Sequence, residues 1–202
     1  LGDPISEGHR VWEWIQRLRY LHPSIALWLP TSNSHQESEQ ASPVDLDLLL
    51  HRIYQSQTVS RFPEFGLTPA FCGQIGQGNK LMLTFNMPEL GHASVELMIG
   101  SALGDALDAS EDLADALMHT TAEFFDPNII GGLSRNDHPI RNLDRDGLAP
   151  FNYSDGWKMF FASDSPHYQR ATQLATRTNP VGNGAIFTFG TPDTYPTILN
   201  QW

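Results

Sequence analysis

Apolar residues recur at spacings of three and four in three stretches of the chain, which predicts three amphipathic helices. The first stretch is Ser6–Leu21. The second begins near Ser42, a residue type that caps helices, and Pro43 suits the first helical position. The third begins at Ser110 and places apolar residues on one side, namely Leu113, Leu117 and Phe124.

Alternation with a period of two, bounded by glycine and proline, predicts strands in the remaining apolar segments. Three of these segments follow one another closely, with a glycine-rich turn at 76–79, and predict an antiparallel meander: Leu67–Ile75, Lys80–Met87 and Ala93–Ile99. Three more are predicted further along: Ile129–Leu133, Trp157–Ala162 and Ala185–Phe189. No repeat or shift in composition marks a boundary. The sequence therefore predicts a single α+β domain over residues 1–202, with helices packed on an antiparallel sheet.

The chain of 202 residues contains one cysteine, Cys72, and so no internal disulfide. Its apolar runs are far shorter than the roughly 20 residues that span a bilayer. The amino-terminal segment has no basic region followed by an apolar run, as a secretory signal would. We therefore expect a cytoplasmic protein, since a reducing compartment suits a chain with one cysteine.

The net charge of -11 is concentrated in one part of the chain. Residues 81–134 contain no lysine or arginine but nine carboxylates: Glu89, Glu96, Asp105, Asp108, Glu111, Asp112, Asp115, Glu123 and Asp126. A negative field repels nucleic acid and anionic lipid, and it attracts basic proteins. The charge thus argues against direct nucleic-acid or membrane binding. The alternative interpretation is that the acidic residues only keep the protein soluble.

Four of these carboxylates form a ridge if the third helix starts near Ser101 instead of Ser110. Spacings of three and four would then place Asp105, Asp108, Asp112 and Asp115 on one face of one helix. Two glycines, Gly100 and Gly104, argue against the early start.

The segment Asn142–Gly147 matches the first six positions of a calcium loop. Its twelfth position is Tyr153, where a bidentate glutamate is needed, so a solvated turn is favoured. The histidines show no zinc-ligand spacing, and Cys72 suits a buried strand position better than a nucleophile. The sequence predicts no catalytic residues, no metal and no cofactor.

Several short signatures, in the same order, resemble the immunity protein 52 family of bacterial polymorphic toxin systems. They are the helix ending and turn Leu21–Trp28, the strand entry Phe65–Leu67 with Val95–Leu97, the helix exit Phe124–Pro127, the strand Asp155–Phe161 and the hairpin Asn179–Thr188. The chain departs from the family in a longer connection at 134–156 and in stopping at Trp202.

The resemblance implies an α+β immunity protein that neutralises a toxin delivered by a system such as type VI secretion, often a nuclease, and it implies no catalytic residues. A basic nuclease groove would attract an acidic protein. We therefore expect the toxin contact at Asp105, Asp108, Glu111, Asp112 and Asp115, with Glu37 and Glu39 as a second candidate. The alternatives are an effector adaptor or chaperone, and a small metal-dependent hydrolase that uses the Asn142–Asp146 loop with His138.

Overall fold

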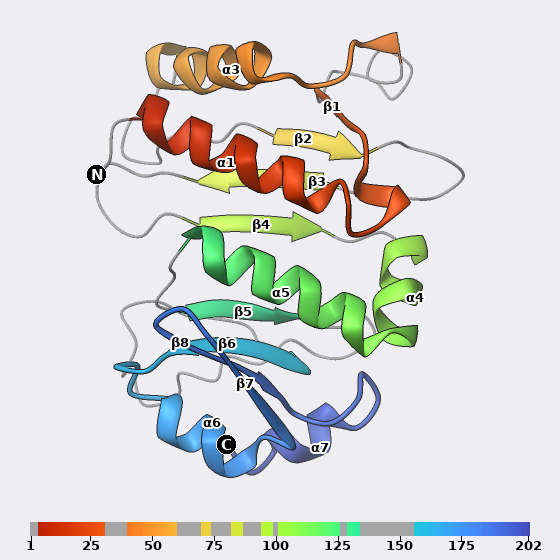
Figure 1. Cartoon of the computed structure of the whole chain (residues 1–202), viewed down its shortest axis with the longest axis vertical. Coiled ribbons are helices and arrows are strands. Elements are labelled where there is room, and N and C mark those ends of the chain that lie inside the picture. The colour runs from red at the N-terminus through yellow and green to blue at the C-terminus, as the bar shows by residue number, and fades with distance from the viewer. Residues whose placement is uncertain are drawn as a thin grey trace. The chain divides into compact units, whose positions relative to one another are not determined.

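The computed structural model describes residues 4–30, 40–59, 70–73, 82–86, 94–98, 101–125, 129–133 and 156–202. The chain folds into two compact units, Leu1–Ala106 and Leu107–Trp202. Each unit contains a four-stranded antiparallel sheet with helices beside it (Figure 1). The predicted α+β class is confirmed, although two sheets form where the pattern suggested one. The single domain over residues 1–202 stays a prediction.

The first unit has the strand order β1-β2-β3-β4, with every neighbouring pair antiparallel. Its elements are α1 (Pro4–Leu18), the 3-10 turn η1 (Pro23–Ile25), β1 (Trp28–Pro30), α3 (Leu46–Val59), β2 (Ala70–Gly73), β3 (Met82–Asn86) and β4 (Ser94–Met98). The predicted meander of β2, β3 and β4 is confirmed. The short strand β1 was not predicted, because its residues belong to a short apolar segment that was interpreted as a turn.

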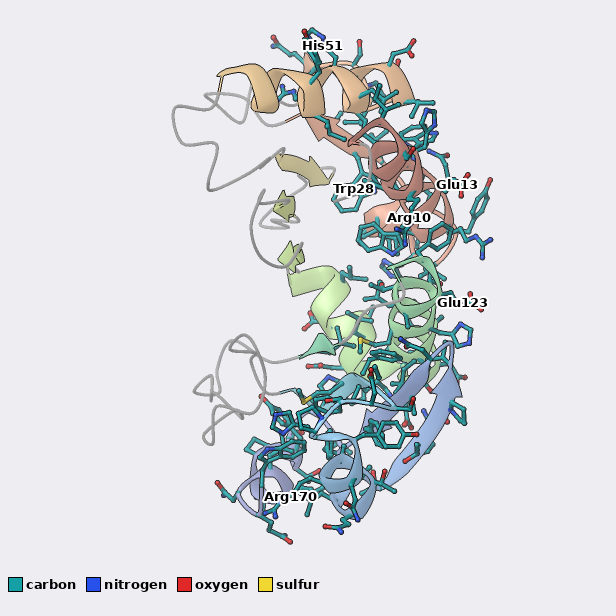
Figure 2. All side chains as sticks on the ribbon, turned by 90° about the vertical axis from the view of Figure 1, so that its left-hand side faces the viewer. Arg10, Glu13, Trp28, His51, Glu123 and Arg170 are labelled. Carbon is teal, nitrogen blue, oxygen red and sulfur yellow. The ribbon has the colours of Figure 1, made fainter. Side chains whose placement is uncertain are left out.

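Helix α1 forms because its apolar residues lie on one face, and they make much of this unit's described core. Trp14, Ile15 and Leu18 are almost completely buried. Helix α3 packs against α1. Gly8 favours this close approach, since a Cβ there would lie 2.6 Å from a methyl group of Leu50 and the Leu50 side chain would have to shift. Trp28 is also fully buried and lies between the strands and α1 in Figure 2.

The start of α3 differs from the prediction. The helix begins at Leu46, four residues after Ser42. Its first turn is capped by Asp45, whose Oδ1 accepts a hydrogen bond of 2.8 Å from the backbone N–H of Leu48. The predicted cap at Ser42 is therefore wrong, since Val44 is buried and the chain stays non-helical up to Asp45.

The second unit has the strand order β5-β6-β8-β7. Its elements are α5 (Glu111–Phe125), β5 (Ile129–Leu133), β6 (Lys158–Ala162), α6 (Tyr168–Leu174), β7 (Arg177–Val181), β8 (Gly184–Thr188) and α7 (Tyr195–Leu199). A further helix, α4 (Ser101–Ala109), contains the boundary between the units. The three strands predicted for this region are present. The strand β7 was expected only from the resemblance, as the first strand of the hairpin Asn179–Thr188, and α6 and α7 were not predicted.

Strand β6 is covered on both faces, and all five of its residues are buried. Phe160 and Ala162 face α5, where they pack with Met118 and Ala122. The alternate residue Phe161 contacts a set of aromatic rings, namely His167, Phe187 and Trp202. Because both faces are buried, β6 reads as a continuous apolar run. Its one charged residue, Lys158, is therefore an exception.

Among the residues that the structure describes, no helix has the length and apolar character needed to cross a membrane.

Candidate functional site on helix α5

Helices α4 and α5 are separate, because Ser110 lies between them and is not helical. The hydroxyl of Ser110 accepts a hydrogen bond of 3.2 Å from the backbone N–H of Leu113, which caps the start of α5. The alternative of one continuous helix from Ser101 is therefore wrong, and the four aspartates do not form a ridge along one helix. Asp105 and Asp108 belong to α4, whereas Asp112 and Asp115 belong to α5.

The strands beneath α5 carry a row of polar residues in register. Lys158 of β6 lies opposite Thr188 of β8, and Thr188 lies opposite Arg177 of β7. Residues that are directly opposite on neighbouring strands point to the same face of the sheet. This face is the one that α5 covers, since Phe160, two residues after Lys158, packs against α5.

Two carboxylates of α5, one helical turn apart, meet this row. The Nζ of Lys158 lies 2.6 Å from Oδ1 of Asp115 and 3.3 Å from Oε1 of Glu111. Arg177 binds the same two residues: Nη2 lies 2.9 Å from Oε1 of Glu111 and also contacts Oδ2 of Asp115. Asn179, the next residue on that face of β7, donates to Oδ2 of Asp115 at 3.4 Å. We name these five residues the α5 ion-pair cluster.

Burial differs sharply across the α5 ion-pair cluster. The side chain of Lys158 is 0% exposed, that of Asp115 is 21% exposed, and those of Arg177 and Glu111 are 40% and 49% exposed. Lys158 also donates a hydrogen bond of 2.9 Å to Oγ1 of Thr188, and its Nζ lies 4.9 Å from the ring centre of Trp157. The contact with Asp115 is mainly electrostatic, since Oδ1 accepts no well-aligned hydrogen bond from the described residues. A buried ammonium group requires nearby carboxylates and hydrogen-bond acceptors, because they offset the loss of its contact with water.

The structure therefore separates the predicted contact residues into two groups. Glu111 and Asp115 bind cations of their own chain, so much of their charge is neutralised internally. Asp105, Asp108 and Asp112 are exposed and lie outside the α5 ion-pair cluster, whereas Glu111 is exposed but belongs to it. Glu37 and Glu39 lie outside the described residues.

Glu123, an acidic residue outside the α5 ion-pair cluster, lies on the same exposed side of α5 as Asp112. His119 lies between them, and its Nδ1 is 3.5 Å from Oε2 of Glu123. Figure 2 shows Glu123 on the outer side of the helix, away from the strands. We name Asp112, His119 and Glu123 the outer face of α5. The opposite side is buried through Ala114, Leu117, Met118 and Ala122.

Lys158 of the α5 ion-pair cluster lies beside the hydroxyl of Thr188, a pairing of a base with a potential nucleophile. Thr188 is 3% exposed and Lys158 is 0% exposed, so a substrate cannot reach this pair. Within the described ranges, no group of three or more His, Cys, Asp or Glu side chains has a metal-binding arrangement. The calcium-loop candidate Asn142–Gly147 lies outside those ranges.

Sequence reasoning missed Lys158 and Arg177, the two cations of the α5 ion-pair cluster. A lysine within the apolar strand run Trp157–Ala162 is a usable signal, because an unpaired lysine is almost never fully buried. No comparable signal marks Arg177. Its strand is rich in polar residues, and its carboxylate partners lie more than sixty residues earlier in the chain.

No protein family, characterised protein or solved structure that was compared with the chain matches it. The resemblance to the immunity protein 52 family is therefore carried by the short signatures alone.

Proposed function

We propose that this protein is an immunity protein that binds a basic protein toxin and neutralises it in the producing cell. The observation that carries the proposal is the outer face of α5, where exposed carboxylates lie in a stretch of more than fifty residues without lysine or arginine. The order of the short sequence signatures supports the same function.

The surface that binds the toxin consists of exposed carboxylates outside the α5 ion-pair cluster. Lys158 and Arg177 neutralise Glu111 and Asp115, so these two hold α5 in place instead of attracting a partner. Asp112 and Glu123 on α5, with Asp108 at the end of α4, are exposed and carry the attraction. Because the helix is fixed to its sheet, its backbone loses no conformational entropy on binding, which favours a specific contact.

A nuclease is the toxin class that fits this surface best, because a nuclease needs a positive groove to bind phosphates. An acidic surface is steered onto such a groove by long-range attraction, and it excludes the substrate once bound. The protein would act in the cytoplasm of the producing cell, where such a toxin would meet its substrate. Its function requires no catalysis and no cofactor.

The test is co-expression with the toxin encoded beside the gene, with a catalytically dead toxin as the control for expression burden. We expect restored growth and a stable complex that co-purifies. An adaptor or chaperone would also form a complex, but it would leave the toxin active. Growth arrest despite complex formation would therefore contradict immunity and favour the adaptor.

A further inference from the structure

The first unit presents a surface of a different kind on the outer side of α1. Arg10 and Arg17 lie two helical turns apart on the same face and are exposed, with Glu13 between them. Tyr20, just after the helix, has 90% of its surface exposed, the largest value among the exposed large hydrophobic side chains described. We name Arg10, Glu13, Arg17 and Tyr20 the outer face of α1.

The helix that carries this face is firmly held. Its inner side is buried through Val11, Trp14, Ile15 and Leu18. At its end, the guanidinium of Arg19 donates to the backbone oxygen of Val44 at 3.2 Å and lies 5.1 Å from the ring centre of Trp12. Burial lowers the pKa of Arg19 below its usual value, although the group stays charged near neutral pH. The outer face of α1 is therefore presented rigidly.

The composition of this face is that of a protein interface. Tyrosine and arginine are enriched at interface centres, because each combines a large contact area with polar groups that fix orientation. Two arginines against one glutamate give the face a net positive charge, whereas the chain as a whole carries -11. Its partner should therefore be an acidic protein surface.

The outer face of α5 is such a surface. Asp112 and Glu123 are exposed on one side of a helix of 15 residues, and no lysine or arginine occurs in that helix. We propose that two copies of this protein associate, with the outer face of α1 of one copy on the outer face of α5 of the other. The contact is between two different surfaces, the outer face of α1 and the outer face of α5.

The overall negative charge of each copy does not prevent this contact at physiological salt. The Debye length is about 8 Å at 0.15 M ionic strength, so repulsion between distant charges is largely screened while pairs in contact still attract. One helix face against another is at the small end of protein interfaces, so we expect weak association. The second copy would also cover the proposed toxin contact, so that toxin and self-association compete.

Sedimentation equilibrium of the full chain tests the proposal without any toxin, at loading concentrations up to roughly 500 µM in 0.15 M salt. Two charge-reversed variants are compared, Arg10→Glu/Arg17→Glu and Asp112→Lys/Glu123→Lys. We expect the average mass of the wild type to rise with concentration, and each variant alone to stay at the mass of one chain. An equimolar mixture of the two should form a 1:1 pair, since it retains one intact α1 face and one intact α5 face.

The mixture gives the decisive result, because all four substitutions are at exposed positions and circular dichroism verifies folding. A double charge reversal at Asp105 and Asp164, exposed acids outside both faces, is the matched control and should associate like the wild type. A wild type that stays at one chain's mass, or a mixture that stays unpaired, would overturn the proposal. Either result leaves toxin neutralisation untouched, because that is scored separately by growth.

Discussion

The ammonium group of Lys158 lies 2.6 Å from the carboxylate of Asp115, in a position where the lysine has no contact with solvent. The two residues are 43 positions apart in the sequence, one on β6 and one on α5. An isolated buried ammonium would be very costly, and a paired one fixes which part of the helix lies over which part of the strand. The pair therefore joins α5 to its sheet at this point, beside the apolar contacts of Met118 and Ala122.

Replacing Asp115 with leucine should destabilise the protein strongly. The substitution leaves the buried Lys158 with only the more distant Glu111 as a carboxylate partner, and we expect a loss of about 3 kcal/mol in the free energy of unfolding. The double variant Asp115→Leu/Lys158→Met removes both charges and should recover most of that loss. Urea denaturation measures the free energies of unfolding of these two variants and of Lys158→Met, which completes a double-mutant cycle. Purely additive effects would contradict direct coupling of the pair.

Two glycines of one hairpin should respond differently to alanine. A Cβ at Gly184 would lie 2.7 Å from Cα of Ala162 on the neighbouring strand, so Gly184→Ala should cost about 3 kcal/mol or more. Gly182 has a φ of 53° with nothing within 4 Å of the added Cβ. Gly182→Ala should therefore cost only about 1 kcal/mol, from backbone strain. Equal shifts in thermal midpoint would show that the close approach at Gly184 is absent.

The cap of α3 can be tested with two substitutions three residues apart. Asp45→Ala removes the acceptor for the N–H of Leu48, and we expect a loss of about 1 kcal/mol. Ser42→Ala should change stability by less than about 0.5 kcal/mol, because Ser42 is exposed and precedes the helix by four residues. Thermal unfolding measures both. A larger loss of stability for Ser42→Ala than for Asp45→Ala would show that Ser42 caps the helix, as the sequence pattern suggested.

Trp202 should contribute to the stability of the second unit. Its ring stacks on Phe161 with centres 5.7 Å apart and meets the edge of Phe189 at 6.1 Å. Trp202→Ala should therefore lower the free energy of unfolding by about 2 kcal/mol. Gln201→Ala, at an exposed neighbour, is the control and should have little effect. A Trp202 variant as stable as that control would mean that the stacking is not formed in solution.

The proposed toxin contact predicts separate effects for the two groups of carboxylates. Asp112→Lys/Glu123→Lys should slow association with the toxin by about tenfold or more. It should lower the free energy of unfolding by only about 1 kcal/mol, because Asp112 lies in the first turn of α5 and Glu123 pairs with His119. Asp115→Asn should act in the opposite way, on stability more than on binding, because Asp115 is held by Lys158 and Arg177. Surface plasmon resonance with a catalytically dead toxin measures the rates. An unaltered rate for the reversed pair would exclude the outer face of α5 as the contact.

The sequence by itself determined the elements whose signal is local. The apolar period of α1, the hydroxyl cap of α5 at Ser110 and the alternation that marks β3 each depend on residues a few positions apart. Such patterns reflect burial of one face of a helix or strand, so they can be read without knowing the partner element. The α+β class follows from them.

Only the tertiary structure decided which charges are available at the surface. The sequence shows Glu111, Asp112 and Asp115 as equivalent members of an acidic stretch. The register of Lys158, Thr188 and Arg177 across three strands makes two of them internal partners and leaves Asp112 exposed. Strand register depends on pairing between distant segments, and no local period encodes it. The same reason explains why the alternation pattern did not predict β7, which was expected only as part of the hairpin Asn179–Thr188 in the family resemblance.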